Sequence, residues 1–523
     1  MQHGKGYSMS DVPLEETVLG FFDPQAVSIH IPRLLPEEVR TGALSIGQLL
    51  LKDPGWGMVF IHEFVHHLQT TTTLSGIRLF HYYWTNRINL LSSLDHEVLE
   101  LVSQGQTLCQ ALSEYKHKKN AYMNSAIKRY DDDFLRYKYF NGITRRPNKH
   151  SHSMPHKTVR VSACREPFQY PGLAELSVPM LKVKIDYPDG NQQETILGAR
   201  HIKEGAARAI EIMFIESYFQ QLKSTAKQRM IRESLSSNPE VTVYYTAFNL
   251  FFSHVRKQRF KHVRVFAIIC ELALLYDVVL SEYDTRVDKC GKLKSFSSKQ
   301  DMLNYWRRDV GPGIVFFHLI QLLNEKYKEI PSFNKESDGE ELYCTLAKLA
   351  NIPISRDSLT SASHFVESSN FLFSNPDWGI FFNYARERIR VGLATRMQWH
   401  TKPVLSFILS NDMKCLVDIM STPTLVCYEN TITAPTKNID ELAPLLFKEL
   451  VDSLLRRGRA ECMLRSKYPQ LCNKSNRCSQ GAYRRVPLDL PKPEFWCPYI
   501  KGVLLVQEWF SPEDKAEGLE GQN

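Results

Sequence analysis

The stretch from residue 57 to residue 69 constrains the fold of this chain more than any other segment. Apolar residues recur there at the spacing of one helical face, at Ile61, Phe64, Val65 and Leu68. This pattern predicts a helix that is buried along that face. The threonines at 70–73 are β-branched and disfavour helix, so a helix end or a bend is predicted there.

Two histidines and a glutamate lie within this apolar pattern. His62 and His66 are four residues apart, which on a helix places both imidazoles on one face and within reach of one metal ion. Glu63 lies one step around the helix, where its carboxylate can reach a water bound to that ion. The pattern H-E-x-x-H is typical of zinc metallopeptidases, so we predict a Zn²⁺ site with Glu63 as the general base.

A catalytic zinc ion needs three protein ligands and an open position for water. A histidine six residues after the second one is ruled out as the third ligand, because Thr72 occupies that position. The remaining solution is a glutamate from a later helix. Glu204 is the strongest candidate, because it opens a helix predicted over residues 199–221. Gly205 follows it and lets that helix pack closely against another.

A second carboxylate follows on the same predicted helix. Glu211 lies seven residues after Glu204, which is two turns, and therefore shares its face. We expect Glu211 to accept a hydrogen bond from the free ring nitrogen of a zinc-bound histidine. The residues that could donate to the oxyanion formed during hydrolysis are Tyr218, Tyr244, Tyr245, His201 and His254. His67 follows the motif directly and points off the ligand face.

The pairing of H-E-x-x-H with E-G-x-A-x-x-x-E at 204–211 resembles the gluzincin metallopeptidases, the group that contains thermolysin and aminopeptidase N. The resemblance implies a zinc ion held by His62, His66 and Glu204, with Glu63 as general base. It covers only a small part of the chain.

The chain departs from that family at several positions. Lys203 stands where aminopeptidases usually have asparagine, and Ala206 stands where they usually have phenylalanine. The spacer between His66 and Glu204 is far longer than in typical members. No G-x-M-E-N stretch, which holds the substrate's amino group in aminopeptidases, is present. The fold of the family is therefore expected here without its specificity for peptide amino termini.

Strands are predicted in only a few short segments, at 18–22, 26–31, 159–161, 180–186 and 194–197. Helical periodicity predicts much of the rest, at 44–51, 57–69, 76–94, 97–139, 199–221, 241–253, 263–280, 313–327, 378–398 and 439–456. The predicted fold class is α+β and mostly α-helical. It comprises a zincin-like catalytic domain with a small antiparallel sheet, and a helical C-terminal domain.

A length of 523 residues is expected to form two or more domains. The polar break at 331–340 is the preferred boundary. It divides the chain into a zincin-like metallopeptidase domain at 1–330, with a long insertion at about 67–203, and a mainly helical domain at 331–523. The polar tail at 511–523 is predicted to be disordered.

Composition narrows the classes of function. A net charge of +8 is modest for this length and does not by itself indicate nucleic-acid binding. Residues 1–16 lack the apolar run of a signal peptide. The most apolar later stretch, 266–280, is interrupted by Glu271 and Asp277 and is too short to span a membrane.

The eleven cysteines are scattered and include no CxxC pair, which favours reduced thiols and a cytoplasmic location. Four of them are denser near the end of the sequence, but their irregular spacing disfavours a second zinc site: Cys462, Cys472, Cys478 and Cys497.

The sequence therefore predicts a cytoplasmic zinc metallopeptidase of gluzincin type that acts on peptide or protein substrates and does not enter a membrane. Two alternatives stay open. The first is a regulatory or nucleic-acid-binding protein on a zincin scaffold, which basic runs at 256–264, 386–396 and 456–465 would suit. The second is an interaction protein in which the motif is accidental, so that the ligand side chains lie far apart. Cleavage specificity and oligomeric state do not follow from the sequence.

Overall fold

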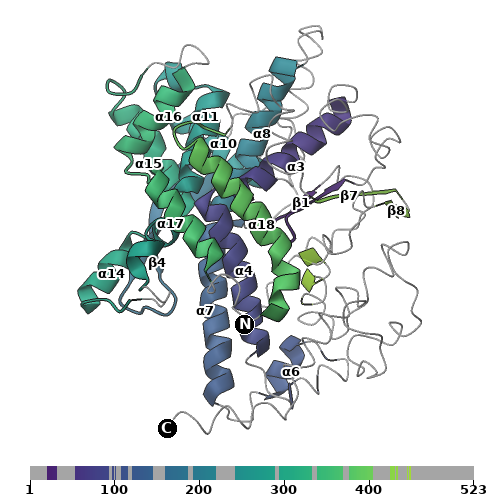
Figure 1. The fold of residues 1–523 in the computed structure, drawn as a ribbon. Helices are drawn as coiled ribbons and strands as arrows, with labels where there is room; N and C mark the ends of the chain where they lie inside the picture. Colours follow the sequence, from purple (N-terminus) through teal and green to yellow (C-terminus); the bar gives the residue numbers. More distant parts are fainter. Residues whose placement is uncertain are drawn as a thin grey trace.

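The computed structural model describes residues 21–31, 54–92, 97–98, 101, 106, 108–115, 121–144, 160–186, 192–218, 242–288, 294–331, 338–368, 376–404, 424–429, 431–433, 444–445, 447–448 and 451. This part of the chain is mostly helical and contains two four-stranded sheets (Figure 1). The predicted α+β, mostly helical class is confirmed at that level.

Helix α3, Pro54–Thr71, carries the histidine motif and has neighbours on several sides. Its apolar residues from Phe60 to Leu68 are buried, and so are His62, Glu63 and His66. The helices that contact it are α4 (Leu74–Ser92), α8 (Ala199–Tyr218) and α18 (Pro376–Gln398). Because α3 also lies against the first sheet, its polar motif residues are held in largely apolar surroundings.

The run of threonines ends α3, as predicted. Three hydroxyl groups donate to the carbonyls four residues earlier, from Thr71 to His67, from Thr72 to Leu68 and from Thr73 to Gln69. These bonds add side-chain donors at the carbonyls of the last helical turn, where the Leu68 carbonyl also accepts from the backbone N–H of Thr72 at 2.8 Å. A Cβ atom at Gly76 would lie 2.2 Å from the Gln69 carbonyl oxygen, so glycine allows α4 to begin this close to the end of α3.

The first sheet joins segments that are far apart in the sequence. Its strands, in the spatial order β1-β2-β7-β8, are Phe21–Asp23, Ser28–Ile31, Thr424–Glu429 and Thr431–Thr433. β1 and β2 form an antiparallel hairpin and overlap the strands predicted at 18–22 and 26–31. β2 pairs with β7 in parallel, and β7 pairs antiparallel with β8. Neither β7 nor β8 was predicted from the sequence, and this sheet is mixed rather than antiparallel.

The second sheet is antiparallel throughout. Its strands, in the spatial order β3-β6-β5-β4, are Ile143–Thr144, Gln192–Ile196, Ser177–Asp186 and Arg160–Gln169. β5 and β6 pair antiparallel, as predicted. β4 is much longer than the predicted strand at 159–161. Its inner face, with Val161, Ala163 and Phe168, is only partly buried, so the apolar alternation along the strand is weak. β4 lies at the edge of the sheet, which is where a strand tolerates a proline such as Pro167.

Helix α8 packs closely against α10, Thr242–His254, and α11, Val263–Leu275. A Cβ atom at Gly205 would lie 3.0 Å from the ring of Phe266 and 3.5 Å from Ala247. The small residue therefore permits the close helix packing that the sequence predicted at this position.

The helix predicted at 263–280 breaks after α11. Asp277 caps a separate short helix, α12 (Val278–Ser281), by accepting a hydrogen bond from the backbone N–H of Leu280. The same carboxylate lies 3.0 Å from the guanidinium of Arg78 on α4. Because the surrounding residues are apolar on both sides of the break, the hydrophobic pattern alone gave no signal for it.

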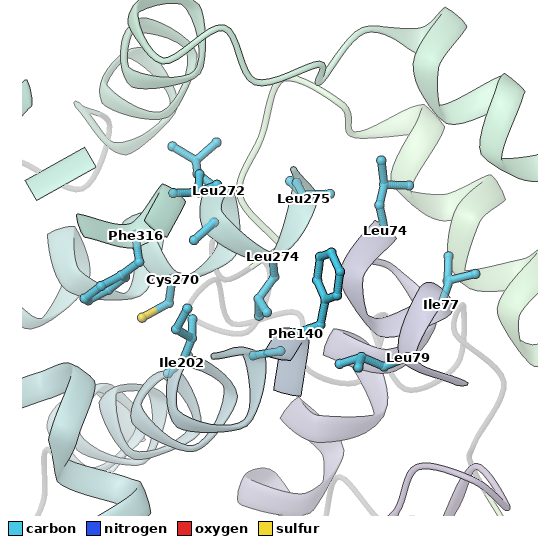
Figure 2. Packing of buried hydrophobic residues seen from close by; sticks show 14 of the residues in the cluster. Leu74, Ile77, Leu79, Phe140, Ile202, Cys270, Leu272, Leu274, Leu275 and Phe316 are labelled. Carbon is cyan, nitrogen blue, oxygen red and sulfur yellow. The ribbon is translucent and has the colours of Figure 1, made fainter. Parts of the chain in front are cut away.

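The apolar core lies between α4, α8, α11 and α15, which spans Pro312–Glu325. Figure 2 shows Ile202 of α8 in the same cluster as Cys270 and Leu274 of α11 and Phe316 of α15. The remaining helices are α6 (Leu108–Tyr115), α7 (Ala121–Asn141), the 3-10 helix η3 (Gln258–Phe260), α13 (Tyr283–Arg286), α14 (Lys299–Arg307), α15 (Pro312–Glu325), α16 (Asp338–Leu349) and α17 (Arg356–Glu367).

Buried residues on both sides of the predicted boundary at 331–340 belong to one hydrophobic cluster, among them Leu342 of α16 and Phe381 of α18. The division into two domains stays a prediction. Among the helices that the structure describes, none is both long enough and apolar enough to cross a membrane. Several predicted features lie outside the described residues: the helix at 44–51, the basic run at 456–465, the clustered cysteines near the end of the sequence and the tail at 511–523.

Candidate metal centre

Helices α3 and α8 bring the three predicted ligand side chains together. Nε2 of His66 lies 3.1 Å from Nε2 of His62 and 3.1 Å from Oε2 of Glu204. Nε2 of His62 lies 3.4 Å from the same carboxylate oxygen. The accidental-motif alternative required these side chains to be far apart, which does not agree with these distances.

The three separations suit a bound zinc ion. Zinc lies about 2.0–2.1 Å from nitrogen and oxygen ligands in a tetrahedral site, so two ligand atoms lie about 3.3 Å from each other. The distances among His62, His66 and Glu204 bracket that value. Two imidazoles and one carboxylate also leave a fourth position open for water, as a catalytic site requires.

The outer nitrogen of His62 faces a second carboxylate. Its Nδ1 atom lies 2.7 Å from Oε1 of Glu211, the residue for which the sequence predicted this contact. Arg208 donates to the other oxygen of Glu211 at 2.5 Å. Burial raises the pKa of Glu211, but His62 and Arg208 outweigh it, so that the pKa lies below its usual value. Glu211 is therefore an ionised carboxylate that pairs closely with the imidazole of His62.

The outer nitrogen of His66 faces an amide that was not predicted from the sequence. Nδ1 of His66 lies 3.0 Å from Oε1 of Gln69, and Nε2 of Gln69 donates to the carbonyl oxygen of Lys203 at 3.1 Å. Gln69 lies three residues after His66, and this spacing on a helix was the available signal. Its partner on α8 is a backbone carbonyl, which side-chain patterns do not reveal.

These contacts leave three hydrogen-bond acceptors facing one another: Nε2 of His62, Nε2 of His66 and Oε2 of Glu204. If Nδ1 of each histidine donates outward, both Nε2 atoms present lone pairs toward Glu204. Such a group is stable only around a positive charge, which a proton or a metal ion can supply. Burial lowers the pKa of His62, but the carboxylates of Glu211 and Glu204 outweigh burial and raise it to about 10.

The two glutamates at the centre differ in their tendency to hold a proton. Burial raises the pKa of Glu204, but His66 and His62 outweigh it and hold that pKa well below its usual value. For Glu63, burial also raises the pKa, and the opposing effect of the imidazoles is too small to cancel it. Glu204 is therefore suited to bind a cation, and Glu63 is suited to take up a proton.

Glu63 could in principle complete the ligand set, because one ligand atom each of His62, Glu63 and His66 lies within 4.8 Å of the others. Glu204 is the better third ligand, since its Oε2 atom lies within 3.4 Å of both Nε2 atoms. Glu63 follows His62 directly and so projects from a neighbouring face of α3. Its carboxylate accepts a hydrogen bond from the backbone N–H of Phe22 in β1.

His201 does not serve as an oxyanion donor in this arrangement. Its Nδ1 atom accepts from the backbone N–H of Gly198 at 3.3 Å, and its Nε2 atom lies 2.7 Å from Oγ1 of Thr144. Burial lowers the pKa of His201 to about 3, against the opposing effect of Glu204, so the ring is neutral. It fixes the start of α8 against β3 and so helps to place Glu204.

His67 also lies away from the three ligands. It is buried against the rings of Phe22 and Phe64. Burial, reinforced by Arg388, lowers the pKa of His67 to about 3.

The other predicted oxyanion donors stay unassigned. Nδ1 of His254 lies near Ser253 and the carbonyl of Leu250 in its own helix. The side chains of Tyr218 and Tyr244 lie outside the described residues, and for Tyr245 the role stays a prediction.

Comparison with protein families, with curated proteins and with solved structures found no match for this chain. The site is therefore interpreted from its own chemistry. It combines a zinc-type ligand set from two helices, an outward acceptor for each imidazole, and a carboxylate of raised pKa beside them.

Proposed function

We propose that this protein is a zinc-dependent peptidase of gluzincin type, with His62, His66 and Glu204 as the metal ligands. One observation carries the proposal: the three ligand atoms lie 3.1–3.4 Å from one another while both imidazoles are oriented from outside. A solvent-exposed or accidental motif would not need two buried acceptors, Glu211 and Gln69, to orient its histidines.

Zinc held by His62, His66 and Glu204 would supply a Lewis acid and would lower the pKa of a bound water to about 7. Glu63 would hold the proton released there and pass it to the leaving amine. Burial raises the pKa of Glu63, which suits both halves of this task, because the group must accept and then release a proton. The backbone N–H of Phe22 orients the carboxylate from the side of the sheet.

The substrate class is a peptide or a protein, and the location that the scattered cysteines favour is the cytoplasm. Cys164, Cys270 and Cys344 are free thiols. The alternative of nucleic-acid binding receives less support. In the basic run at 386–396, Arg390 pairs with Glu387, and Arg396 is buried against Glu271.

The proposal is tested by metal content together with hydrolysis. Purified protein is expected to contain a stoichiometric amount of zinc and to cleave members of a quenched-fluorescent peptide library. Glu63→Gln is expected to keep the zinc and to lose roughly 10²–10⁴-fold in rate, because general acid–base catalysis contributes about that much. His66→Ala is expected to lose both zinc and activity.

The matched control is Glu216→Gln, which neutralises an exposed carboxylate on α8 and should change neither zinc content nor rate. Protein that binds no zinc at any neutral pH would overturn the metal site. Zinc-loaded protein whose hydrolysis is the same with Glu63→Gln would overturn the peptidase assignment and leave the metal site standing.

A further inference from the structure

Gln69 connects the two helices that supply the metal ligands. Its Oε1 atom lies 3.0 Å from Nδ1 of His66, and its Nε2 atom donates at 3.1 Å to the carbonyl of Lys203. Lys203 immediately precedes Glu204 in the chain. One buried side chain therefore joins a ligand on α3 to the backbone beside the third ligand on α8.

The direction of this amide follows from the chemistry of its partners. A backbone carbonyl can only accept a hydrogen bond, so the NH₂ group of Gln69 must face Lys203. The amide oxygen must then face His66, whose Nδ1 atom must donate. The lone pair of His66 Nε2 is thereby directed toward Glu204, which is the tautomer that a metal ligand needs.

The backbone at Gln69 is itself held firmly. The hydroxyl of Thr73 donates to its carbonyl oxygen, which Gly76 approaches so closely that a Cβ atom there would lie 2.2 Å away. The end of α3 and the start of α4 therefore fix the base of the side chain. Because its backbone is fixed, the Gln69 side chain can hold the His66 ring in a defined position relative to α8.

We propose that Gln69 is a positioning residue of the metal site, and that it sets the tautomer and orientation of His66 by bridging His66 to the Lys203 carbonyl. The inference rests on the proposed function, because it concerns the binding of zinc. Removal of a side chain that hydrogen-bonds the outer nitrogen of a metal-bound histidine typically weakens metal binding by roughly 10- to 100-fold.

The test measures zinc affinity by competition with a chelating dye, so it does not depend on catalysis. Gln69→Met keeps similar bulk and removes both hydrogen bonds, and it should weaken zinc binding by roughly 10- to 100-fold. Gln69→Asn keeps the amide but is one methylene shorter, so it cannot span both partners and should weaken binding similarly. The shorter polar variant also serves if Gln69→Met does not fold.

The control is Thr70→Val, which removes the contact of Thr70 Oγ1 with Lys203 Nζ at 3.4 Å without touching His66. Zinc affinity should stay within about twofold of wild type in that variant, which corresponds to a change of roughly 0.4 kcal/mol in binding free energy. Cobalt(II) substitution supplies a second readout, because the visible absorption of the ion reports the geometry of its ligands.

The inference is overturned if both Gln69 variants bind zinc as tightly as wild type, with the same cobalt spectrum. It is also overturned if Thr70→Val weakens binding as much, since the loss would then reflect general damage to the α3–α8 contact. A wild-type protein that binds no zinc would instead overturn the proposed function, and that outcome is recognised before any variant is compared.

Discussion

At the scale of the residue, the partners of a buried histidine decide its chemistry more than burial does. His62 and His67 are both buried on α3, five residues apart in the chain. Burial lowers the pKa of His62, but two carboxylates outweigh it and raise it to about 10. For His67, burial and Arg388 together lower the pKa to about 3. The His62 ring therefore favours a positive charge, whereas the His67 ring favours the neutral form.

His201 gives a prediction on the pH dependence of stability. Burial lowers its pKa to about 3, from 6.5 in the unfolded chain. The neutral ring therefore contributes stability that is fully present above pH 6.5 and is lost as the pH falls toward 3. Between pH 7.5 and pH 5 this loss amounts to roughly 2 kcal/mol. His201→Asn should remove this part of the dependence, because asparagine does not titrate.

The measurement is urea unfolding of both proteins at pH 7.5 and pH 5. The variant should be less stable at pH 7.5. The difference in free energy of unfolding between the two proteins should be smaller by roughly 2 kcal/mol at pH 5. Thr144→Val removes the partner of His201 Nε2 but keeps the titrating ring, so its gap to wild type should stay constant. A constant gap for His201→Asn would contradict the prediction.

At the scale of the element, α18 is held against the end of α3 by a glycine. A Cβ atom at Gly392 would lie 2.5 Å from the carbonyl oxygen of Thr71. Gly392→Ala should therefore lower the free energy of unfolding by roughly 1–3 kcal/mol, because the two backbones must move apart. The higher helix propensity of alanine, worth about 1 kcal/mol, acts in the opposite direction and is not enough.

Thermal or urea unfolding measures this effect. The matched substitution on the same helix is Asn383→Ala at an exposed position, which should change stability by no more than about 0.5 kcal/mol. If Gly392→Ala proves more stable than wild type, the close approach of α18 and α3 is wrong.

Some helices and strands could be predicted from the sequence, and others could not. α3 and α8 were predicted because apolar residues recur along them at helical spacing and small residues mark their close contacts. The break before α12 was not, because the residues on both sides of it are apolar and Asp277, which caps α12, is a single polar residue in that pattern. β4 was mostly missed, because its inner face is only partly buried and Glu166 and Pro167 interrupt the apolar pattern of Val161, Ala163 and Phe168.

The residues of the candidate site likewise include some that could be predicted from the sequence and one that could not. His62, His66, Glu204 and Glu211 were identified because their spacing on two helices carries chemical meaning, and the structure brings all four within contact distance. Gln69 was missed because its role depends on the carbonyl of Lys203, a backbone atom whose location follows only from the packing of α8.

At the scale of the whole molecule, a short C-terminal segment packs onto the N-terminal half. The buried ring of Phe447 stacks on Trp84 of α4 at 5.5 Å and on Phe381 of α18 at 4.5 Å. Lys448 then pairs with Asp23 at the end of β1 at 2.5 Å. These contacts tie the segment to the strand whose backbone orients Glu63.

Phe447→Ala should cost roughly 3–5 kcal/mol of stability, because it leaves a cavity among aromatic rings. Phe447→Leu fills part of that cavity and should recover a substantial share. Leu135→Ala, at a residue that is 45% exposed, is the control and should be close to neutral. Equal unfolding midpoints for wild type and Phe447→Ala would contradict this packing.

The parallel pairing of β2 with β7 has a consequence for how the chain is made. Residues 28–31 leave the ribosome early, whereas their partner at 424–427 follows nearly four hundred residues later. During that interval one edge of β2 has no backbone partner and can pair with other chains. Non-local pairing of this kind is also slow. Refolding yield should therefore fall as protein concentration rises, and newly made chains should benefit from chaperones that cover the open edge.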